Sequence, residues 1–249
     1  MAIIIKTAKE VEKMRRAGSL VHDVLQAVRA MAAPGMTTMD LDREAERLIV
    51  EAGAKPAFKG YHGFPATLCT SLNEQVVHGI PDRKSILREG DIVSVDCGAV
   101  LEGYYGDSAI TIPVGTVKPG AQKLLDVTQA SLQQAIEAVR PGATLGDVGA
   151  AVQEIVEAAG FSVVKEFVGH GIGTRMHEDP QVPNFGQRGK GIKLREGMVL
   201  AIEPMVNVGG DGVRVLKDGW TAVTEDGTLS AHFEHTVAVT ADGAMILTA

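Results

Sequence analysis

Two acidic residues stand next to apolar, strand-like runs, where a carboxylate is rarely buried unless it is paired. Asp96 follows the run at residues 91–95, and Asp107 comes eleven residues later, before the run at 108–112. Folding this segment as a hairpin about its midpoint places Asp96 directly opposite Asp107, on the same face of the sheet. Like charges in that position destabilise a strand pair. We therefore expect a proton or a cation between the two carboxylates.

A second acidic pair repeats this arrangement later in the chain. Glu203 follows the run at residues 198–202, and Glu234 stands in the run at 232–237. This second hairpin is about twenty residues longer than the first, and the additional segment contains residues 217–220. The imidazole of His170 adds a nitrogen donor to the four carboxylates, and such a set suits divalent Mn, Fe, Co or Zn. Carboxylates that bridge two such ions permit two-metal hydrolysis.

Each of these residues also has an ordinary structural interpretation. Asp96 precedes Cys97-Gly98 and could be a turn residue at a strand end, since turns favour aspartate. Glu234 could be a solvated strand residue, and His170 a loop histidine with a structural hydrogen bond. Their combined occurrence, with Asp96 and Glu203 at equivalent places in an internal repeat, favours a metal site.

The elements that position these residues form two similar halves. The chain matches itself at one constant sequence offset over helices, a turn and a strand, which chance does not readily produce. The matching positions are Pro34-Gly35 with Pro141-Gly142, Thr37 with Thr144, Asp40 with Asp147, Ala52-Gly53 with Ala159-Gly160, residues 87–90 with 194–197, and Asp96 with Glu203.

Each half begins with a pair of amphipathic helices that are separated by a Pro-Gly break and end at a glycine. Each helix pair leads into β-branched runs with the alternation of a hairpin. We expect helices from Thr7, in a capping box with Glu10, to about Met31, from about Thr38 to Gly53, from about Lys123 to Val139, and one that ends at Gly160.

This organisation predicts an α+β fold of two pseudo-two-fold-related halves, each with two helices and a β-hairpin, around a central antiparallel sheet. We expect one domain over residues 1–249, with halves at about 1–115 and 116–249 that share one core. Matching strands should lie beside the axis, so that Asp96 and Glu203 face each other at its centre.

The composition is that of an ordinary globular protein, with 45% hydrophobic and 22% charged residues. Its apolar stretches are too short to cross a bilayer, and no signal-peptide pattern is present, so a cytoplasmic location without a membrane is expected. The net charge of −7 without a basic run argues against a nucleic-acid partner. The two cysteines, Cys69 and Cys97, lack CxxC spacing and form no disulfide framework.

The chain resembles the type I methionine aminopeptidases over nearly its whole length. No single motif is specific, but their order and spacing together are. The resemblance implies the "pita-bread" fold with internal pseudo-symmetry, in a single catalytic domain. The motifs are GYHGFP at 60–65, NEQVVHGIP at 73–81, SVDCGA at 94–99, GYYGDSA at 103–109, GHGIG at 169–173, MHEDP at 176–180, EPM at 203–205 and FEHT at 233–236.

The resemblance also implies roles for the five candidate ligands. Asp96 chelates one divalent ion, Asp107 and Glu234 bridge both ions, and His170 and Glu203 complete the shell of the other. The ions are Co, Mn, Fe or Zn, and a bridging water or hydroxide attacks the first peptide bond. Glu203 assists as the proton acceptor.

Two further histidines match positions that contact the substrate. By resemblance, His78 contacts the scissile amide nitrogen and His177 stabilises the tetrahedral oxyanion. A neutral imidazole suits both tasks near neutral pH, although each residue could also be a loop histidine with a structural hydrogen bond. Asn73 and Ser230 match positions where the family binds a monovalent cation.

The resemblance further implies an apolar methionine pocket, in which aromatic rings can contact the substrate sulfur. Each of its residues could also be plain core. Phe58 stands where a small residue such as Cys is frequent in the family, and Met176 where Phe is frequent, so methionine preference is kept while the pocket shape changes. The pocket residues are Phe58, Tyr61, Phe64, Cys69, Met176 and Trp220.

The expected substrates are the N-termini of nascent polypeptides with a small second residue, met by a monomeric enzyme during transient contact with the ribosome. One alternative is an Xaa-Pro aminopeptidase or prolidase of the same fold. Such enzymes usually carry a large additional N-terminal domain, for which there is no room before Thr7. Another alternative is a non-catalytic binding protein, which the complete ligand set disfavours.

Overall fold

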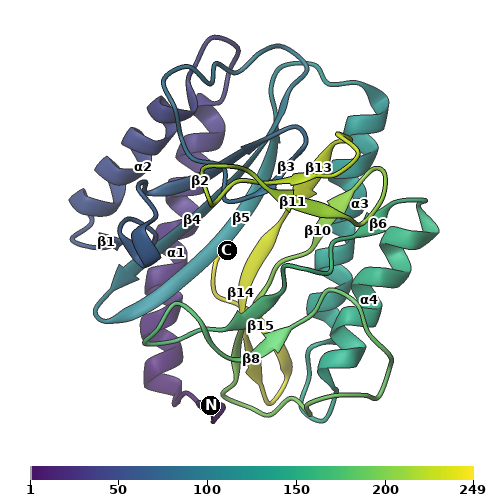
Figure 1. The fold of residues 1–249 in the computed structure, drawn as a ribbon. Helices are drawn as coiled ribbons and strands as arrows, with labels where there is room; N and C mark the ends of the chain where they lie inside the picture. Colours follow the sequence, from purple (N-terminus) through teal and green to yellow (C-terminus); the bar gives the residue numbers. More distant parts are fainter. Residues whose placement is uncertain (1) are drawn as a thin grey trace.

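The computed structural model describes residues 2–249. Four helices lie on one side of a large sheet, as a pair in each half of the chain (Figure 1). They are α1 Ala8–Met31, α2 Thr38–Glu51, α3 Pro119–Ala138 and α4 Leu145–Ala158, and a short 3-10 helix, η1, spans Tyr61–Gly63.

The strands form one large antiparallel sheet and two small ones. The order in the large sheet is β1-β4-β5-β14-β9-β7-β8, with β2 paired to β4 and β15 to β14. The small sheets are β13-β10-β6 and β11-β12-β3. The strands are β1 Lys55–Pro56, β2 Leu68–Leu72, β3 Gln75–Val77, β4 Ile92–Leu101, β5 Tyr104–Pro113, β6 Ser162–Val163, β7 Gly169–Gly171, β8 Glu178–Val182, β9 Val199–Ile202, β10 Met205–Asn207, β11 Val213–Val215, β12 Ala222–Thr224, β13 Ser230–His232, β14 Glu234–Thr240 and β15 Gly243–Ile246.

The predicted α+β fold is confirmed, and the helices agree closely with the sequence patterns. Thr7 and Glu10 form the expected capping box at α1. The one clear difference is the start of α3, which was predicted at about Lys123 and lies at Pro119. Proline is favoured in the first turn because its fixed φ suits a helix and its missing N–H needs no partner there.

Equivalent contacts recur in the two halves at the offset of the sequence repeat. The side chain of Thr37 caps α2 in a box with Asp40, and Thr144 caps α4 in the same way with Asp147. Thr37 also bridges to Ile86 in antiparallel fashion, as Thr144 does to Lys193. The sequence repeat is thus also a structural one.

Alternation along the strands separates the two faces of the sheet. On β4, Val93, Val95 and Cys97 are fully buried against α1 and α2, so Asp96 between them points to the opposite face. On β14, Val237 and Val239 pack toward α3 and α4, which turns Glu234 to the same face as Asp96. The helices therefore stabilise one face and leave the other for the acids.

The predicted pairing of Asp96 directly opposite Asp107 is wrong. Asp96 pairs with Ala109, and Asp107 pairs with Gly98, so the acids are diagonal neighbours on one face. The cause is a two-residue turn, Glu102-Gly103, in which both residues have positive φ. That turn type moves the hairpin centre toward the C-terminus and shifts the pairing by two residues.

The second acidic pair does have the predicted, directly opposed arrangement. His235 pairs with Ile202, so Glu203 and Glu234 come next in register and lie directly opposite each other. The expectation that Asp96 and Glu203 face each other at the axis is also wrong. Their strands, β4 and β9, are separated by β5 and β14, which pair with each other and join the halves.

The long connection in the second hairpin forms strands of its own. It contains β10 to β13, and β12 pairs with β3 from the first half. Trp220 lies in the turn between β11 and β12, and His78 directly follows β3. This cross-pairing brings Trp220 beside His78, with ring centroids 6.3 Å apart.

Candidate active site

Five neighbouring strands each contribute one candidate ligand to the open face of the sheet. Asp96 lies on β4, Asp107 on β5, Glu234 at the start of β14, Glu203 directly after β9, and His170 on β7. These strands are consecutive in the sheet, so residues from both halves of the chain converge. One ligand atom from each of Asp107, His170 and Glu234 lies within 4.8 Å of the others.

The polar atoms of this cluster face one another without donors between them. The Nδ1 of His170 lies 2.9 Å from the carbonyl oxygen of Gly171, to which its N–H donates. This bond leaves the lone pair of Nε2 directed at Asp107 Oδ2, 3.6 Å away, and Glu203 Oε1, 3.7 Å away. Among residues 2–249, the buried oxygens Asp96 Oδ1, Asp107 Oδ1 and Glu234 Oε1 have no hydrogen-bond partner. Acceptors that converge in this way fit divalent cations.

The charges of the cluster point to the same conclusion. Burial, followed by the neighbouring carboxylates, raises the pKa of Asp96, Glu203 and Glu234 well above the usual range. Burial raises the pKa of Asp107 to about 8. Ionised carboxylates so close together require positive charge among them, and bound cations supply it.

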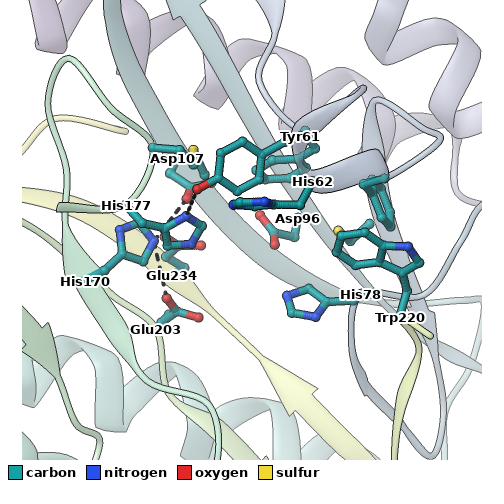
Figure 2. Close-up of a pocket in the computed structure, with 14 residues that line it drawn as sticks. Tyr61, His62, His78, Asp96, Asp107, His170, His177, Glu203, Trp220 and Glu234 are labelled. Atoms are coloured by element: carbon teal, nitrogen blue, oxygen red, sulfur yellow. Dashed lines mark hydrogen bonds and ion pairs between the residues drawn. The ribbon is translucent and has the colours of Figure 1, made fainter. Parts of the chain in front are cut away.

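The cluster lies in the wall of a cavity of about 540 Å³, which Figure 2 shows with its lining residues. The predicted divalent-metal ligands, both substrate-contacting histidines and the methionine-pocket residues all line this cavity. His62, which was not predicted, lines it as well. The residues are Phe58, Tyr61, His62, Phe64, Cys69, His78, Asp96, Asp107, His170, Met176, His177, Glu203, Trp220 and Glu234.

One side of the cavity is apolar and closely packed. The rings of Phe64 and Trp220 meet edge to face with centroids 5.1 Å apart. Met176, 3% exposed, and Phe58 belong to the same buried cluster. Cys69 on β2 pairs with Asp96, which places this apolar side directly beside the acids.

Two further histidines line the cavity, and Figure 2 shows His177 beside His170 and His78 beside Trp220. The ring of His177 lies 4.2 Å from that of His170, and its Nδ1 is 2.8 Å from the hydroxyl of Tyr61. Although His177 is open to solvent, desolvation by the surrounding cavity lowers its pKa to about 4. Burial lowers the pKa of His78 to about 4 as well. Both are neutral imidazoles at neutral pH, able to donate a hydrogen bond.

The sequence matches the model of metallopeptidase family M24 over residues 12–241. The chain belongs to this family. It is 52% identical over 246 residues to a methionine aminopeptidase of Clostridium acetobutylicum, a match that covers 99% of the chain and 98% of that relative. The solved structure of a methionine aminopeptidase from Thermotoga maritima superimposes with a TM-score of 0.98 at 50% identity and covers 99% of each chain.

The M24 fold also occurs in proteins of other specificity. A prolidase of Pyrococcus horikoshii superimposes with a TM-score of 0.79 at 24% identity, but the match covers only 63% of that chain. This likeness concerns the pita-bread fold alone. Within residues 2–249, none of the helices combines the length and apolar character needed to cross a bilayer.

Two positions of this M24 chain were assigned to a monovalent cation. Asn73 and Ser230 lie together, because the N–H of Ser230 donates to the carbonyl of Asn73 over 2.9 Å. The Asn73 side chain donates to Asp91 and accepts from Ile92. Since the carbonyl of Asn73 retains a second lone pair, it could bind a cation, and this role stays a prediction.

One buried histidine beside the five candidate ligands was not predicted from the sequence. His232 is 1% exposed, and its Nε2 lies 3.6 Å from Glu203 Oε2. Burial lowers its pKa to about 3. The signal that could have revealed it is its position two residues before Glu234 on an apolar run.

Proposed function

We propose that this M24 chain is a dinuclear metallo-aminopeptidase that removes the initiator methionine from new polypeptides. One observation carries the proposal: a cation-type acid cluster and an apolar pocket with aromatic and sulfur side chains share one cavity. The cluster supports hydrolysis, and the pocket supports an unbranched, polarizable side chain next to the bond that is cut.

Two divalent ions would be held by Asp96, Asp107, His170, Glu203 and Glu234. When bound, such ions supply electrophilic activation of the scissile carbonyl and of the attacking water. The residues present fit this task, because the lone pair of His170 and unpartnered carboxylate oxygens converge on one space. Manganese, iron, cobalt and zinc all accept this donor set.

The chain's own side chains then position the substrate and move protons. The hydroxyl of Tyr61 lies 2.8 Å from Nδ1 of His177. In the tautomer in which this hydroxyl donates to Nδ1, the N–H at Nε2 is available to the oxyanion that forms from the carbonyl. His78, packed against Phe167 and Trp220, is placed for a contact with the scissile amide nitrogen. Glu203 accepts the proton of the attacking water.

The apolar side of the cavity receives the methionine side chain. Phe64 and Trp220 form its aromatic wall, and Phe58 and Met176 belong to the same buried cluster. The second substrate residue must pass close to the acid cluster, so small residues such as Gly and Ala are preferred there.

The natural substrates are the N-termini of nascent chains, reached in the cytoplasm by a monomer during transient contact with the ribosome. A net charge of −7 without a basic run supports contact with the emerging peptide rather than with nucleic acid. Asn73 and Ser230, which share a backbone hydrogen bond, are proposed to hold one monovalent cation.

Hydrolysis of Met-Gly-Met by metal-reconstituted protein tests the proposal, with an Xaa-Pro peptide as the competing substrate. We expect turnover of Met-Gly-Met but not of the Xaa-Pro peptide. Peptides that begin with Met-Lys or Met-Phe should be cleaved only a little. Preference for the Xaa-Pro peptide would assign the chain to the prolidase-like branch. No uptake of divalent metal and no turnover would indicate a binding protein.

A matched variant tests the metal cluster itself. Asp96→Ala should remain folded and lose measurable activity, because Asp96 faces the cavity while Val95 and Cys97 hold β4 against the helices. Val95→Ala serves as the control, since it weakens the core without touching the cluster. Full activity of Asp96→Ala would refute the proposed metal site.

A further inference from the structure

The two hairpins of the central sheet are related by two different sequence offsets. The first strands, β4 and β9, match at the offset that relates Asp96 to Glu203. In the first hairpin, Asp96 pairs with Ala109. In the second hairpin, His235 pairs with Ile202, so Glu203 lies opposite Glu234. The second strands, β5 and β14, therefore match at a larger offset, which relates Ala109 to Glu234. The difference between the two offsets reflects the longer connection in the second half.

Backbone hydrogen bonds support the larger offset independently. The N–H of Gly90 donates to Val114 over 2.9 Å, and the N–H of Gly197 donates to Val239 over 2.9 Å. Gly90 and Gly197 are related by the smaller offset, whereas Val114 and Val239 are related by the larger one. The same pseudo-two-fold axis therefore relates both strand pairs.

Under this relation His232 is the counterpart of Asp107. The hydroxyl of Thr236 donates to the backbone carbonyl of Asp107 over 2.7 Å and accepts from the backbone N–H of Asp107 over 3.2 Å. The hydroxyl of Thr111 does the same for His232, at 2.8 Å and 2.9 Å. Two threonines at equivalent places thus hold a proposed ligand in one half and a buried histidine in the other.

The two oxygens of Glu203 each face an imidazole nitrogen. On one side, Oε1 meets the lone pair of His170 Nε2, since the N–H of that ring is directed to Gly171. Two acceptors that converge need a proton or a cation between them, and this donor set suits a divalent cation. On the other side, Oε2 lies 3.6 Å from His232 Nε2, which has no hydrogen-bond partner among the described residues. An N–H at this nitrogen gives an attractive contact, and a lone pair would give a repulsive one.

We propose that His232 is a positioning residue of the metal centre, whose Nε2–H donates to Oε2 of Glu203 and so directs Oε1 to the cation. The inference rests on the proposed metal site. A movement of less than about 1 Å by the carboxylate shortens the contact to hydrogen-bonding distance. Such partners fix the orientation of a ligating carboxylate, and their loss typically reduces metal affinity or activity about 10- to 100-fold.

Two amide variants distinguish a hydrogen-bonding role of His232 Nε2 from a role in which the imidazole ring only fills space. The amide nitrogen of His232→Gln reaches the place of Nε2, whereas that of His232→Asn reaches only the place of Nδ1. Binding of Mn²⁺ to metal-free protein is measured by titration calorimetry, and hydrolysis of Met-Gly-Met is measured alongside. We expect His232→Gln to keep wild-type affinity and His232→Asn to bind Mn²⁺ about 10- to 100-fold more weakly.

His235→Asn is the matched control, because it removes an imidazole from the same run on the opposite face, where its Nδ1 contacts Thr248. It should bind Mn²⁺ as the wild type does. Unchanged Mn²⁺ affinity in His232→Asn, or equal losses in both His232 variants, overturns the role of Nε2 while the metal centre stands. Failure of the wild type to bind Mn²⁺ overturns the metal centre and this inference together.

Discussion

Replacing Lys6 with methionine should destabilise the protein far more than loss of an ordinary surface lysine. The ammonium of Lys6 lies 2.7 Å from Glu178 Oε2, with the two side chains only 3% and 1% exposed. Removing one partner of a buried pair leaves the other charge uncompensated, which typically costs about 3–5 kcal/mol. Glu178 Oε1 still accepts from the N–H groups of Thr174 and Arg175, so the lower end, about 3 kcal/mol, applies.

The expected change in thermal stability follows from the size of the chain. A domain of this size loses about 2–4 °C of melting temperature per kcal/mol, so Lys6→Met should melt about 6–12 °C below the wild type. Calorimetric unfolding of the metal-free proteins measures this difference. The double variant Lys6→Met, Glu178→Gln should recover part of it, because no unpaired charge then remains buried.

The same substitution should also affect catalysis, because Glu178 ends the loop that carries Met176 and His177. Lys165→Met is the control: its partner Asp211 lies 2.6 Å away, but both side chains are about half exposed, so water replaces the lost contact. Its melting temperature should stay at the wild-type value. A Lys6→Met protein as stable as Lys165→Met, or a double variant no more stable than Lys6→Met, would refute the reasoning.

Three further predictions concern the cavity. In the folded, metal-free protein the pKa of Asp107 is about 8, whereas its ordinary value is 3.8. The neutral carboxyl group therefore contributes stability that is fully present below about pH 4 and is lost as the pH rises toward 8. The melting temperature of Asp107→Asn minus that of the wild type should therefore increase from pH 5 to pH 8, and a constant difference contradicts this. Trp220→Ala removes the ring that packs on Phe64 and should lower kcat/KM for Met-Gly-Met about tenfold; an unchanged value would exclude it from the methionine pocket. The Cβ of Gly98→Ala would lie 2.7 Å from Cε1 of Phe58 and push that ring into the pocket, so KM should rise, whereas an unchanged KM would show that the ring moves elsewhere.

The helices and the acids could be predicted from the sequence because their signals are local. Thr7 with Glu10 is a complete capping pattern within four residues, and the structure contains it. Asp96 stands out because Val95 and Cys97 beside it are apolar, and alternation alone then turns it to the other face of the sheet. Neither inference needs knowledge of which strands become neighbours.

The register of the hairpins could not be predicted, because it depends on the turn. The prediction placed the centre of the hairpin midway between Asp96 and Asp107. The observed turn, Glu102-Gly103, lies one residue further toward the C-terminus. Both turn residues adopt positive φ, which is costly for glutamate and does not follow from its side chain. A shift of two residues keeps each acid on its face, so the predicted cluster survives the wrong pairing.

The pocket residues were placed by resemblance rather than by spacing. Phe64 and Trp220 come from opposite halves and meet only because β12 pairs with β3. No local pattern in the sequence encodes that pairing. His62 was missed for a related reason, since its exposure to the cavity depends on an unusual positive φ inside η1.

The duplication explains where the acids lie, but the chemistry depends on where the halves differ. A symmetric pair of hairpins would place a second aspartate at the counterpart of Asp107 and a second alanine at that of Ala109. The chain has His232 and Glu234 at those places instead, which moves the acceptors to one side of the axis beside His170. Cations held by these acceptors would lie off the axis, while His232, in its proposed role, would donate from the other side. The longer second hairpin adds Trp220 to the cavity wall near His78, so the proposed methionine pocket depends on a segment that the first hairpin lacks.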